Sequence, residues 1–126
     1  QDVTVADAMS SPVVTVEPTL PLPRVVDMMY ETKHLGFPVV DRGSLIGIVA
    51  LADVHKISPI DREAMQVRDV MTRNPTVLPP SAPLIDALRI ITGQDIGRIP
   101  VVEDGTLVGI VTRTDVLRVM ELREGE

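Results

Sequence analysis

Gly109-Ile110-Val111-Thr112-Arg113-Thr114-Asp115-Val116 is one of two related segments in a chain of 126 residues. The other, Gly47-Ile48-Val49-Ala50-Leu51-Ala52-Asp53-Val54, precedes it by 62 positions. Each segment begins with a β-branched apolar run, which favours a strand. Each then places an aspartate, Asp53 or Asp115, near the start of the helix that follows. The two segments therefore predict a strand that leads directly into a helix, in two copies.

The duplication extends over most of the chain. With a shift of 62 positions, 16 of the 50 residues from Val5 to Val54 are identical to their counterparts. An internal repeat of this regularity indicates one structural unit made twice. We predict two repeats, residues 1–62 and residues 63–126. A unit of about 60 residues is marginally stable alone, so the two repeats are expected to pack together.

Each repeat predicts the element order β-α-β-β-α. The helix between the first two strands is expected to begin with Thr19 or Ser81 as N-cap. A tight turn with glycine joins the last two strands, at Gly43 and Gly105. The fold class is α+β: two pseudo-symmetric repeats packed sheet to sheet, with helices outside. The predicted strands are Val13–Val16, Phe37–Asp41 and Ser44–Val49, and then Thr76–Leu78, Ile99–Glu103 and Thr106–Val111.

Composition excludes several functions. The chain has 12 basic and 18 acidic residues, a net charge of −6, and no cysteine. This argues against a nucleic-acid polymer as partner and removes disulfides and thiolate metal sites. The longest apolar stretch, Leu45–Ala52, is far shorter than the roughly 20 residues that span a bilayer. We expect no membrane contact and a cytoplasmic chain, or the cytoplasmic part of a larger protein from which this segment is cut.

Catalytic motifs are not found in the sequence. There is no Gly-x-Ser-x-Gly or His-Glu-x-x-His pattern, and Gly105–Gly109 lacks the Lys-Ser/Thr that completes a phosphate-binding loop. The two histidines, His34 and His55, lack the spacing of metal ligands. We therefore expect neither an enzyme nor a metal site.

The ordered motifs resemble a known family, the tandem cystathionine-β-synthase (CBS) domain pair or Bateman module. Three segments and their first-repeat counterparts carry this resemblance: Val67–Pro75, Ile99–Gly105 and Gly109–Val116. The resemblance implies a regulatory module that binds AMP, ADP, ATP or S-adenosylmethionine in clefts between the repeats. It also implies a homodimer, of prokaryotic type, that controls an attached effector domain or a partner protein.

Two alternatives stay open. The chain is a dimerisation module without a ligand, or it is the soluble regulatory tail of a larger protein such as a membrane metalloprotease or a transporter. The segment Asp95–Gly105 is similar to the CBS tails of site-2-type membrane metalloproteases. It is equally similar to stand-alone prokaryotic CBS proteins.

The preferred ligand site lies in the second repeat. The resemblance assigns Asp115 to the ribose hydroxyls and Thr112 to a phosphate. The chemistry agrees, because a carboxylate accepts hydrogen bonds from a vicinal diol and a helix N-terminus attracts a phosphate. Arg98 and Arg113 add cationic donors for a phosphate. The expected adenine walls are Val77, Ile99 and Pro100, and backbone groups near Thr76 are expected to read the base edge.

A structural role competes with this assignment, because Thr112 and Asp115 also fit a capping box. The first repeat keeps Asp53 but has Ala50 in place of Thr112, and an alanine N-cap costs a helix about 1 kcal/mol. We interpret a carboxylate retained without its hydroxyl partner as favouring ligand binding.

The first-repeat site is expected to be weaker. Gly36, Ala50 and Leu51 stand where the second repeat has Arg98, Thr112 and Arg113, so the phosphate end loses three polar groups. Here Phe37 is expected to stack on a base, and His34, or Lys33 beside it, to reach a phosphate. The other candidates are Asp53, Thr15, Val16 and Pro38. The alternatives are an empty site or one for a less charged adenosyl compound.

Overall fold

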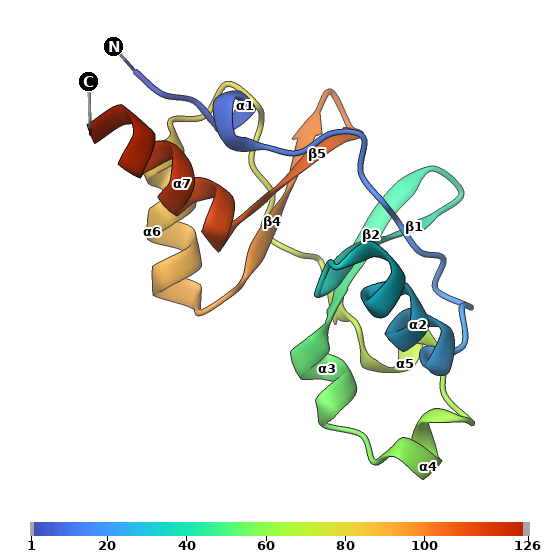
Figure 1. The fold of residues 1–126 in the computed structure, drawn as a ribbon. Helices are drawn as coiled ribbons and strands as arrows, with labels where there is room; N and C mark the ends of the chain where they lie inside the picture. Colours follow the sequence, from blue (N-terminus) through green and yellow to red (C-terminus); the bar gives the residue numbers. More distant parts are fainter. Residues whose placement is uncertain (1, 125–126) are drawn as a thin grey trace. The chain divides into compact units, whose positions relative to one another are not determined.

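Two antiparallel hairpins form the sheets of the computed structural model, which describes residues 2–124 (Figure 1). β1 (Gly36–Asp41) pairs with β2 (Ser44–Ala50), and β4 (Arg98–Glu103) pairs with β5 (Thr106–Thr112). A two-residue strand, β3 (Thr72–Arg73), adds to the edge of β2. The four hairpin strands lie within one residue of their predicted bounds, so this part of the prediction is confirmed.

The turns of both hairpins have the predicted chemistry. Arg42 and Gly43 have φ angles of 51° and 82°, and Asp104 and Gly105 have 51° and 77°. Two consecutive positive φ angles make a type I′ turn, whose twist matches that of the flanking strands. Glycine at the second position removes the steric penalty of this conformation, as the sequence predicted.

Helices connect and cover these hairpins. They are α1 (Val5–Ala8), α2 (Leu22–Thr32), α3 (Leu51–His55), α4 (Pro59–Arg62), α5 (Val67–Val70), α6 (Leu84–Gln94) and α7 (Arg113–Glu124). α3 and α7 follow β2 and β5 without a loop, as the repeated segments predicted. None of the helices between residues 2 and 124 has both the length and the apolar character to cross a membrane.

The predicted first strand of each repeat is only a single bridge. Val16 pairs in parallel with Val39, and Leu78 pairs in parallel with Val101. The β-branched runs around them are too short and too near prolines to extend the ladder, because proline has no N–H to donate.

The predicted N-caps Thr19 and Ser81 are wrong. α2 begins at Leu22 and α6 at Leu84, and each follows a proline. The Leu22 N–H donates to the Met65 carbonyl at 2.9 Å, and the Leu84 N–H to the Val3 carbonyl at 2.8 Å. Backbone acceptors far away in sequence therefore satisfy the first N–H of each helix, and no capping side chain is needed.

The chain divides into two compact units that do not coincide with the repeats. One unit is Val14–Pro75, and the other combines residues 2–13 with residues 76–124. We call residues 2–13 and 63–75 the first and second leader. Each leader thus belongs to the unit that holds the body of the other repeat. The repeat limits of 1–62 and 63–126 describe the duplication in sequence. In the compact units, each leader is grouped with the body of the other repeat.

Each unit has its own apolar core. In Val14–Pro75 the core joins α2, the β1–β2 hairpin and α3 with Val67 and Met71 of the second leader. In the other unit, α6 and α7 pack with each other and with the β4–β5 hairpin, and α1 of the first leader packs against both helices (Figure 1). Val5 of α1 is completely buried there. A leader therefore supplies part of the core of each unit.

Candidate functional site

The candidate site of the second repeat lies at one end of the β4–β5 hairpin. Arg98, the first residue of β4, pairs with Thr112, the last residue of β5. α7 begins at the next residue, so that Asp115 lies in its first turn. The Leu78 N–H donates to the Pro100 carbonyl, so the segment that begins at Thr76 lies alongside β4. The fold therefore gathers the predicted polar residues at a single end of the sheet.

Asp115 is the one charged residue buried among residues 2–124, with 8% of its surface exposed. Its Oδ2 accepts the backbone N–H of Thr112 at 2.9 Å, and its Oδ1 lies 3.4 Å from an Nη of Arg118. In return, Thr112 Oγ1 accepts the backbone N–H of Asp115 at 3.1 Å. The capping-box interpretation of these two residues is therefore confirmed.

Three backbone donors at the start of α7 are already engaged. Thr112 and Asp115 donate within the capping box, and the Arg113 N–H donates to the Gly97 carbonyl at 3.0 Å. These three N–H groups are not free to bind a phosphate, in contrast to the expectation for a helix N-terminus. The side chains suited to a phosphate here are the Thr112 hydroxyl and the guanidinium groups of Arg98 and Arg113.

Two of the predicted site residues contact polar side chains at the end of α6. Thr76 Oγ1 donates to Gln94 Oε1 at 3.0 Å. An Nη of Arg113 lies 4.0 Å from Oδ1 of Asp95, whose side chain is fully exposed. Asp95 has a φ of 51° and ends α6 in the left-handed conformation. Neither partner could be predicted from the sequence, because only the folded chain brings them to Thr76 and Arg113.

Arg118 was also missed, although a signal was present. It follows Asp115 by three positions, and residues at this spacing are neighbours on a helix surface. Its contact with Oδ1 leaves no oxygen of the carboxylate without a neighbouring donor. A ligand diol would have to share Oδ1 with Arg118 or replace it.

The expected adenine walls are only partly available. Ile99 is completely buried and belongs to the core with Val101 and Val111. Pro100 is buried as well, whereas Val77 is 40% exposed. The role of Ile99 as an adenine wall stays a prediction, although its side chain belongs to the core. Val77 is the exposed one of the three predicted apolar residues.

In the first repeat, Asp53 has a structural role. Its Oδ2 accepts the Ala50 N–H at 2.8 Å, although Ala50 has no hydroxyl to complete a capping box. Asp7 and Asp69, which are not candidate site residues, accept the N–H of Thr4 and Gln66 in the same way at 2.8 Å. The retention of Asp53 is thus explained by this bond and does not by itself indicate a ligand.

The other first-repeat candidates separate into buried and exposed residues. Phe37 is 1% exposed and Val16 4%, and both belong to the core. The expected stacking of Phe37 on a base stays a prediction, and it would require the ring to leave the core of the unit. Pro38 is buried, whereas Thr15 and His34 are exposed. These residues do not form a polar cluster comparable to that of the second repeat.

The two repeats share their register and differ in the side chains placed on it. Gly36 pairs with Ala50 in the first hairpin, where the second hairpin pairs Arg98 with Thr112. The Leu51 N–H donates to the Leu35 carbonyl at 2.9 Å, just as Arg113 donates to Gly97. The backbone is therefore repeated while the polar side chains are lost. Among residues 2–124, no group of three or more His, Asp or Glu side chains is placed to hold a metal ion.

Solved structures of CBS pairs closely match this fold. CBSX2, a CBS-pair protein of Arabidopsis thaliana, is 28% identical with a TM-score of 0.86 over 100% of this chain and 99% of its own. CBSX2 in complex with AMP is 30% identical with a TM-score of 0.82, over 96% and 98% of the two chains. A CBS domain pair in complex with 5′-methylthioadenosine and S-adenosyl-L-methionine is 25% identical with a TM-score of 0.88, over 98% and 99%.

Curated relatives are longer proteins. A zinc metalloprotease of Methanocaldococcus jannaschii is 34% identical over 118 residues, which cover 94% of this chain and 32% of the relative. An A-adding tRNA nucleotidyltransferase of Aquifex aeolicus is 35% identical over 122 residues, 93% of this chain and 14% of the relative. This chain therefore spans a third or less of these two relatives. The CBS domain model matches residues 5–59 and again residues 67–122, so the chain belongs to the CBS domain family as a tandem CBS pair.

Proposed function

We propose that this CBS pair is a regulatory module that binds an adenosine-containing ligand in its second repeat and controls an attached or partner protein. One observation carries the proposal: Thr76, Arg98, Thr112, Arg113 and Asp115 converge on one end of the β4–β5 hairpin. The AMP complex of CBSX2 and the S-adenosyl-L-methionine complex of another CBS pair support this class of ligand.

Each residue has a role that suits its chemistry. Asp115 accepts hydrogen bonds from the ribose diol, with Oδ1 exchanging Arg118 for a ligand hydroxyl. Arg98 and Arg113 provide donors for a phosphate, and the Thr112 hydroxyl donates its proton while its lone pair keeps the Asp115 N–H. Val77 offers an apolar surface to the base. AMP, ADP and ATP use all of these groups, whereas S-adenosylmethionine needs no phosphate donors.

Regulation follows from linkage. A ligand that changes the equilibrium between two states of the module is itself bound more tightly by one of them. We infer that the module is a cytoplasmic homodimer of prokaryotic type. It controls an effector domain or a separate protein, because CBS segments occur within longer chains of differing activity. The first repeat, without the three polar groups, is proposed to be empty or to take a less charged adenosyl compound.

Calorimetric titration with AMP, ATP and S-adenosylmethionine tests the site. Asp115→Ala should weaken binding about tenfold to a hundredfold, because a hydrogen bond to a charged group contributes about 1.5–3 kcal/mol. Asp69→Ala is the matched control, since Asp69 accepts the same kind of helix-start N–H outside the site. The control should bind like the wild type.

Equal affinities of the wild type and Asp115→Ala would contradict the assignment of Asp115. A thermal-shift screen tests the proposal more broadly, because ligand at 100 times its Kd should stabilise the chain by about 2.7 kcal/mol. If no adenosine compound changes the Tm, the chain is instead a dimerisation module without this ligand.

A further inference from the structure

Arg118 pairs with the buried carboxylate that the proposed ligand site offers to a ribose. An Nη of Arg118 lies 3.4 Å from Oδ1 of Asp115, while Oδ2 accepts the Thr112 N–H at 2.9 Å. The side chain of Asp115 is 11% exposed, whereas that of Arg118 is 62% exposed. The two oxygens therefore differ. Oδ2 is held by the backbone, and Oδ1 is held by a side chain that can move away.

The contact between Arg118 and Asp115 is loose enough to be displaced. Its 3.4 Å exceeds the roughly 2.7–2.9 Å of a strong charge-assisted hydrogen bond. Among residues 2–124, Asp115 is the one acidic residue that forms an ion pair with Arg118. A pair whose cation is largely exposed is worth about 1.4- to 5-fold in a binding constant. A ligand hydroxyl can overcome a competitor of this strength.

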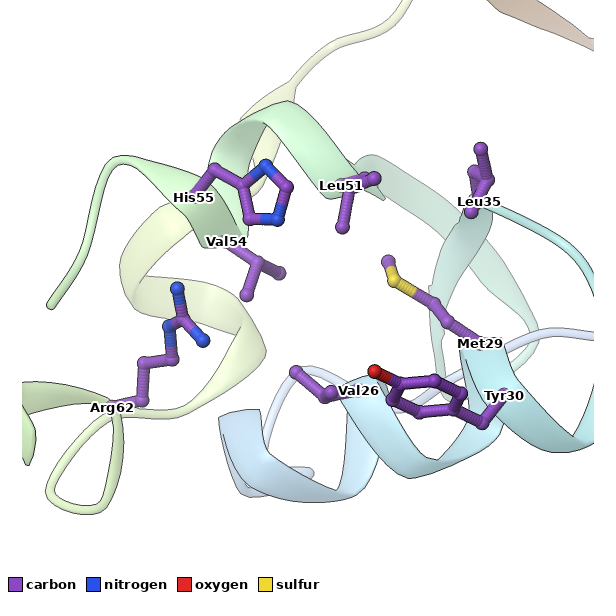
Figure 2. A pocket seen from close by; sticks show the side chains of 8 residues that line it. All are labelled: Val26, Met29, Tyr30, Leu35, Leu51, Val54, His55 and Arg62. Carbon is purple, nitrogen blue, oxygen red and sulfur yellow. The ribbon is translucent and has the colours of Figure 1, made fainter. Parts of the chain in front are cut away.

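The first repeat lacks this ion pair. Lys56 is the counterpart of Arg118 at the offset of 62 positions, but α3 ends at His55, and no ion pair among residues 2–124 includes Asp53. Figure 2 shows that the next arginine along the chain, Arg62, lines a pocket beside α2. The pairing of a cation with the helix-start carboxylate is therefore a property of the second repeat and not of the fold that both repeats share.

We propose that Arg118 competes with the ribose for Asp115 and thereby sets how the site discriminates between sugars, an inference that rests on the proposed adenosine site. A vicinal diol takes both oxygens of the carboxylate and displaces Arg118 from Oδ1. A sugar with one of these hydroxyls binds at Oδ2, which has a second lone pair, and leaves the ion pair intact. Arg118 is thus a positioning residue that holds Asp115 in the empty site and lowers the affinity for ribose in particular.

Displacement of an ion pair also gives adenosine binding a characteristic salt dependence. Adenosine is uncharged, so it gains no ionic contact in exchange for the pair that it breaks. Salt screens the largely exposed pair of Arg118 and Asp115, and a higher ionic strength should therefore strengthen adenosine binding. A phosphate contact has the opposite dependence, because screening weakens its attraction to Arg98 and Arg113.

Calorimetric titration of the full chain with adenosine, 2′-deoxyadenosine and 3′-deoxyadenosine tests this inference. Arg118→Gln keeps a long polar side chain but removes the charge, and it should bind adenosine about 1.4- to 5-fold more tightly than the wild type does. The gain should be absent for the deoxynucleoside that lacks the hydroxyl placed at Oδ1. For adenosine, the difference between the variant and the wild type should narrow as salt is added.

Two further variants serve as controls. Arg89→Gln is matched to Arg118→Gln, because Arg89 forms the same kind of pair with Asp86, three positions earlier on α6, at 3.9 Å. It should leave all three affinities unchanged. Arg118→Lys retains the positive charge and should bind adenosine like the wild type, which separates the effect of charge from that of the substitution itself.

The outcomes distinguish this inference from the adenosine site on which it rests. Equal or weaker adenosine binding by Arg118→Gln, together with a loss of binding in Asp115→Ala, would overturn the role of Arg118 and leave the adenosine site in place. An equal gain for all three nucleosides would overturn it as well, since Arg118 would then not act through a displaced hydroxyl. If adenosine binds neither the wild type nor Arg118→Gln, both the site and this inference fail.

Discussion

Four aspartates occupy the third position of a helix and accept the backbone N–H of the residue three positions earlier. They are Asp7, Asp53, Asp69 and Asp115. The cap residues in front of them differ, being Thr4, Ala50, Gln66 and Thr112. A carboxylate in the first turn is favoured by the helix dipole and by this single bond, whatever the cap residue is. Asp115 differs from the others in its burial and in its contact with Arg118.

Substitutions at Ala50 and Thr112 test how much the cap hydroxyl contributes to stability. Ala50→Thr should stabilise the chain by about 1 kcal/mol, because the new hydroxyl can accept the Asp53 N–H and complete the capping box. Thr112→Ala should cost a similar amount by removing the bond to the Asp115 N–H. Urea unfolding of both variants measures the two changes. A loss in Thr112→Ala without a gain in Ala50→Thr would show that the half-buried site at Ala50 cannot accommodate the larger side chain.

Asp95 pairs with Arg113, so in the proposed site it would compete with a phosphate for this guanidinium. Asp95→Asn removes the negative charge, and asparagine tolerates the positive φ of 51° at this position. An exposed ion pair contributes about 0.2–1 kcal/mol, so AMP affinity should rise about 1.4- to 5-fold at low salt. Adenosine, which lacks the phosphate, should bind both proteins equally. An equal gain for adenosine and AMP in calorimetry would mean that Asp95 does not act through the phosphate.

At the scale of elements, each leader packs closely against a glycine of a hairpin. A Cβ on Gly47 would lie 2.7 Å from the Thr72 carbonyl oxygen and 2.9 Å from Met71 Sδ. A Cβ on Gly109 would lie 2.5 Å from Met9 Sδ but 3.2 Å from the Ser10 carbonyl oxygen. Each methionine thus packs on a strand at a position where only glycine fits. The crowding is with backbone at Gly47 and with a flexible side chain at Gly109.

This difference predicts that removing the neighbouring methionine will restore stability in one glycine variant and not in the other. Gly47→Ala and Gly109→Ala should each destabilise the chain by about 1–3 kcal/mol through overpacking. Adding Met9→Ala should relieve Gly109→Ala, with a coupling of about 1 kcal/mol or more in a double-mutant cycle. Adding Met71→Ala should not relieve Gly47→Ala, because the Thr72 carbonyl remains in place. Similar coupling in both cycles, measured by chemical unfolding, would contradict this account.

Local sequence was sufficient to predict the hairpins, their turns and the strand-to-helix junctions. Glycine at the positive φ of Gly43 and Gly105 and the β-branched runs act through neighbouring residues, so a single sequence reveals them. The starts of α2 and α6 could not be predicted in this way. Their first N–H groups donate to carbonyls of Met65 and Val3, which the fold supplies from distant segments.

In the candidate site, too, some contacts follow from neighbouring residues and others from distant segments. The Thr112 and Asp115 bonds follow from spacing, whereas the contacts of Thr76 with Gln94 and of Arg113 with Asp95 require tertiary structure. The burial of each candidate side chain was the property that the sequence revealed least. An aromatic residue after a loop suggested a stacking surface at Phe37, but the ring fills the core of a unit that has few other large side chains.

At the scale of the whole molecule, the exchange of leaders makes the compact units differ from the repeats. Val14–Pro75 is contiguous in sequence and contains Val67 and Met71, which complete its core. The second leader also supplies backbone partners, since the Val67 N–H donates to the Leu20 carbonyl at 3.0 Å. A fragment cut at the repeat limit, residues 1–62, would lack all of these contacts. It would instead carry the first leader, whose partners lie in the other unit.

We therefore expect the fragment 14–75 to be better folded than the fragment 1–62, although both have about the same length. Units of about 60 residues are close to the limit of independent stability, so the loss of Val67 and Met71 should be decisive. Circular dichroism and amide hydrogen exchange measure the difference, and the Val25 and Val49 amides report on the core directly. Val67→Asp in fragment 14–75 should reduce it to the behaviour of fragment 1–62, because a charge would replace a completely buried side chain. Greater protection in fragment 1–62 than in fragment 14–75 would show that the repeat, and not the leader-exchanged unit, is what folds.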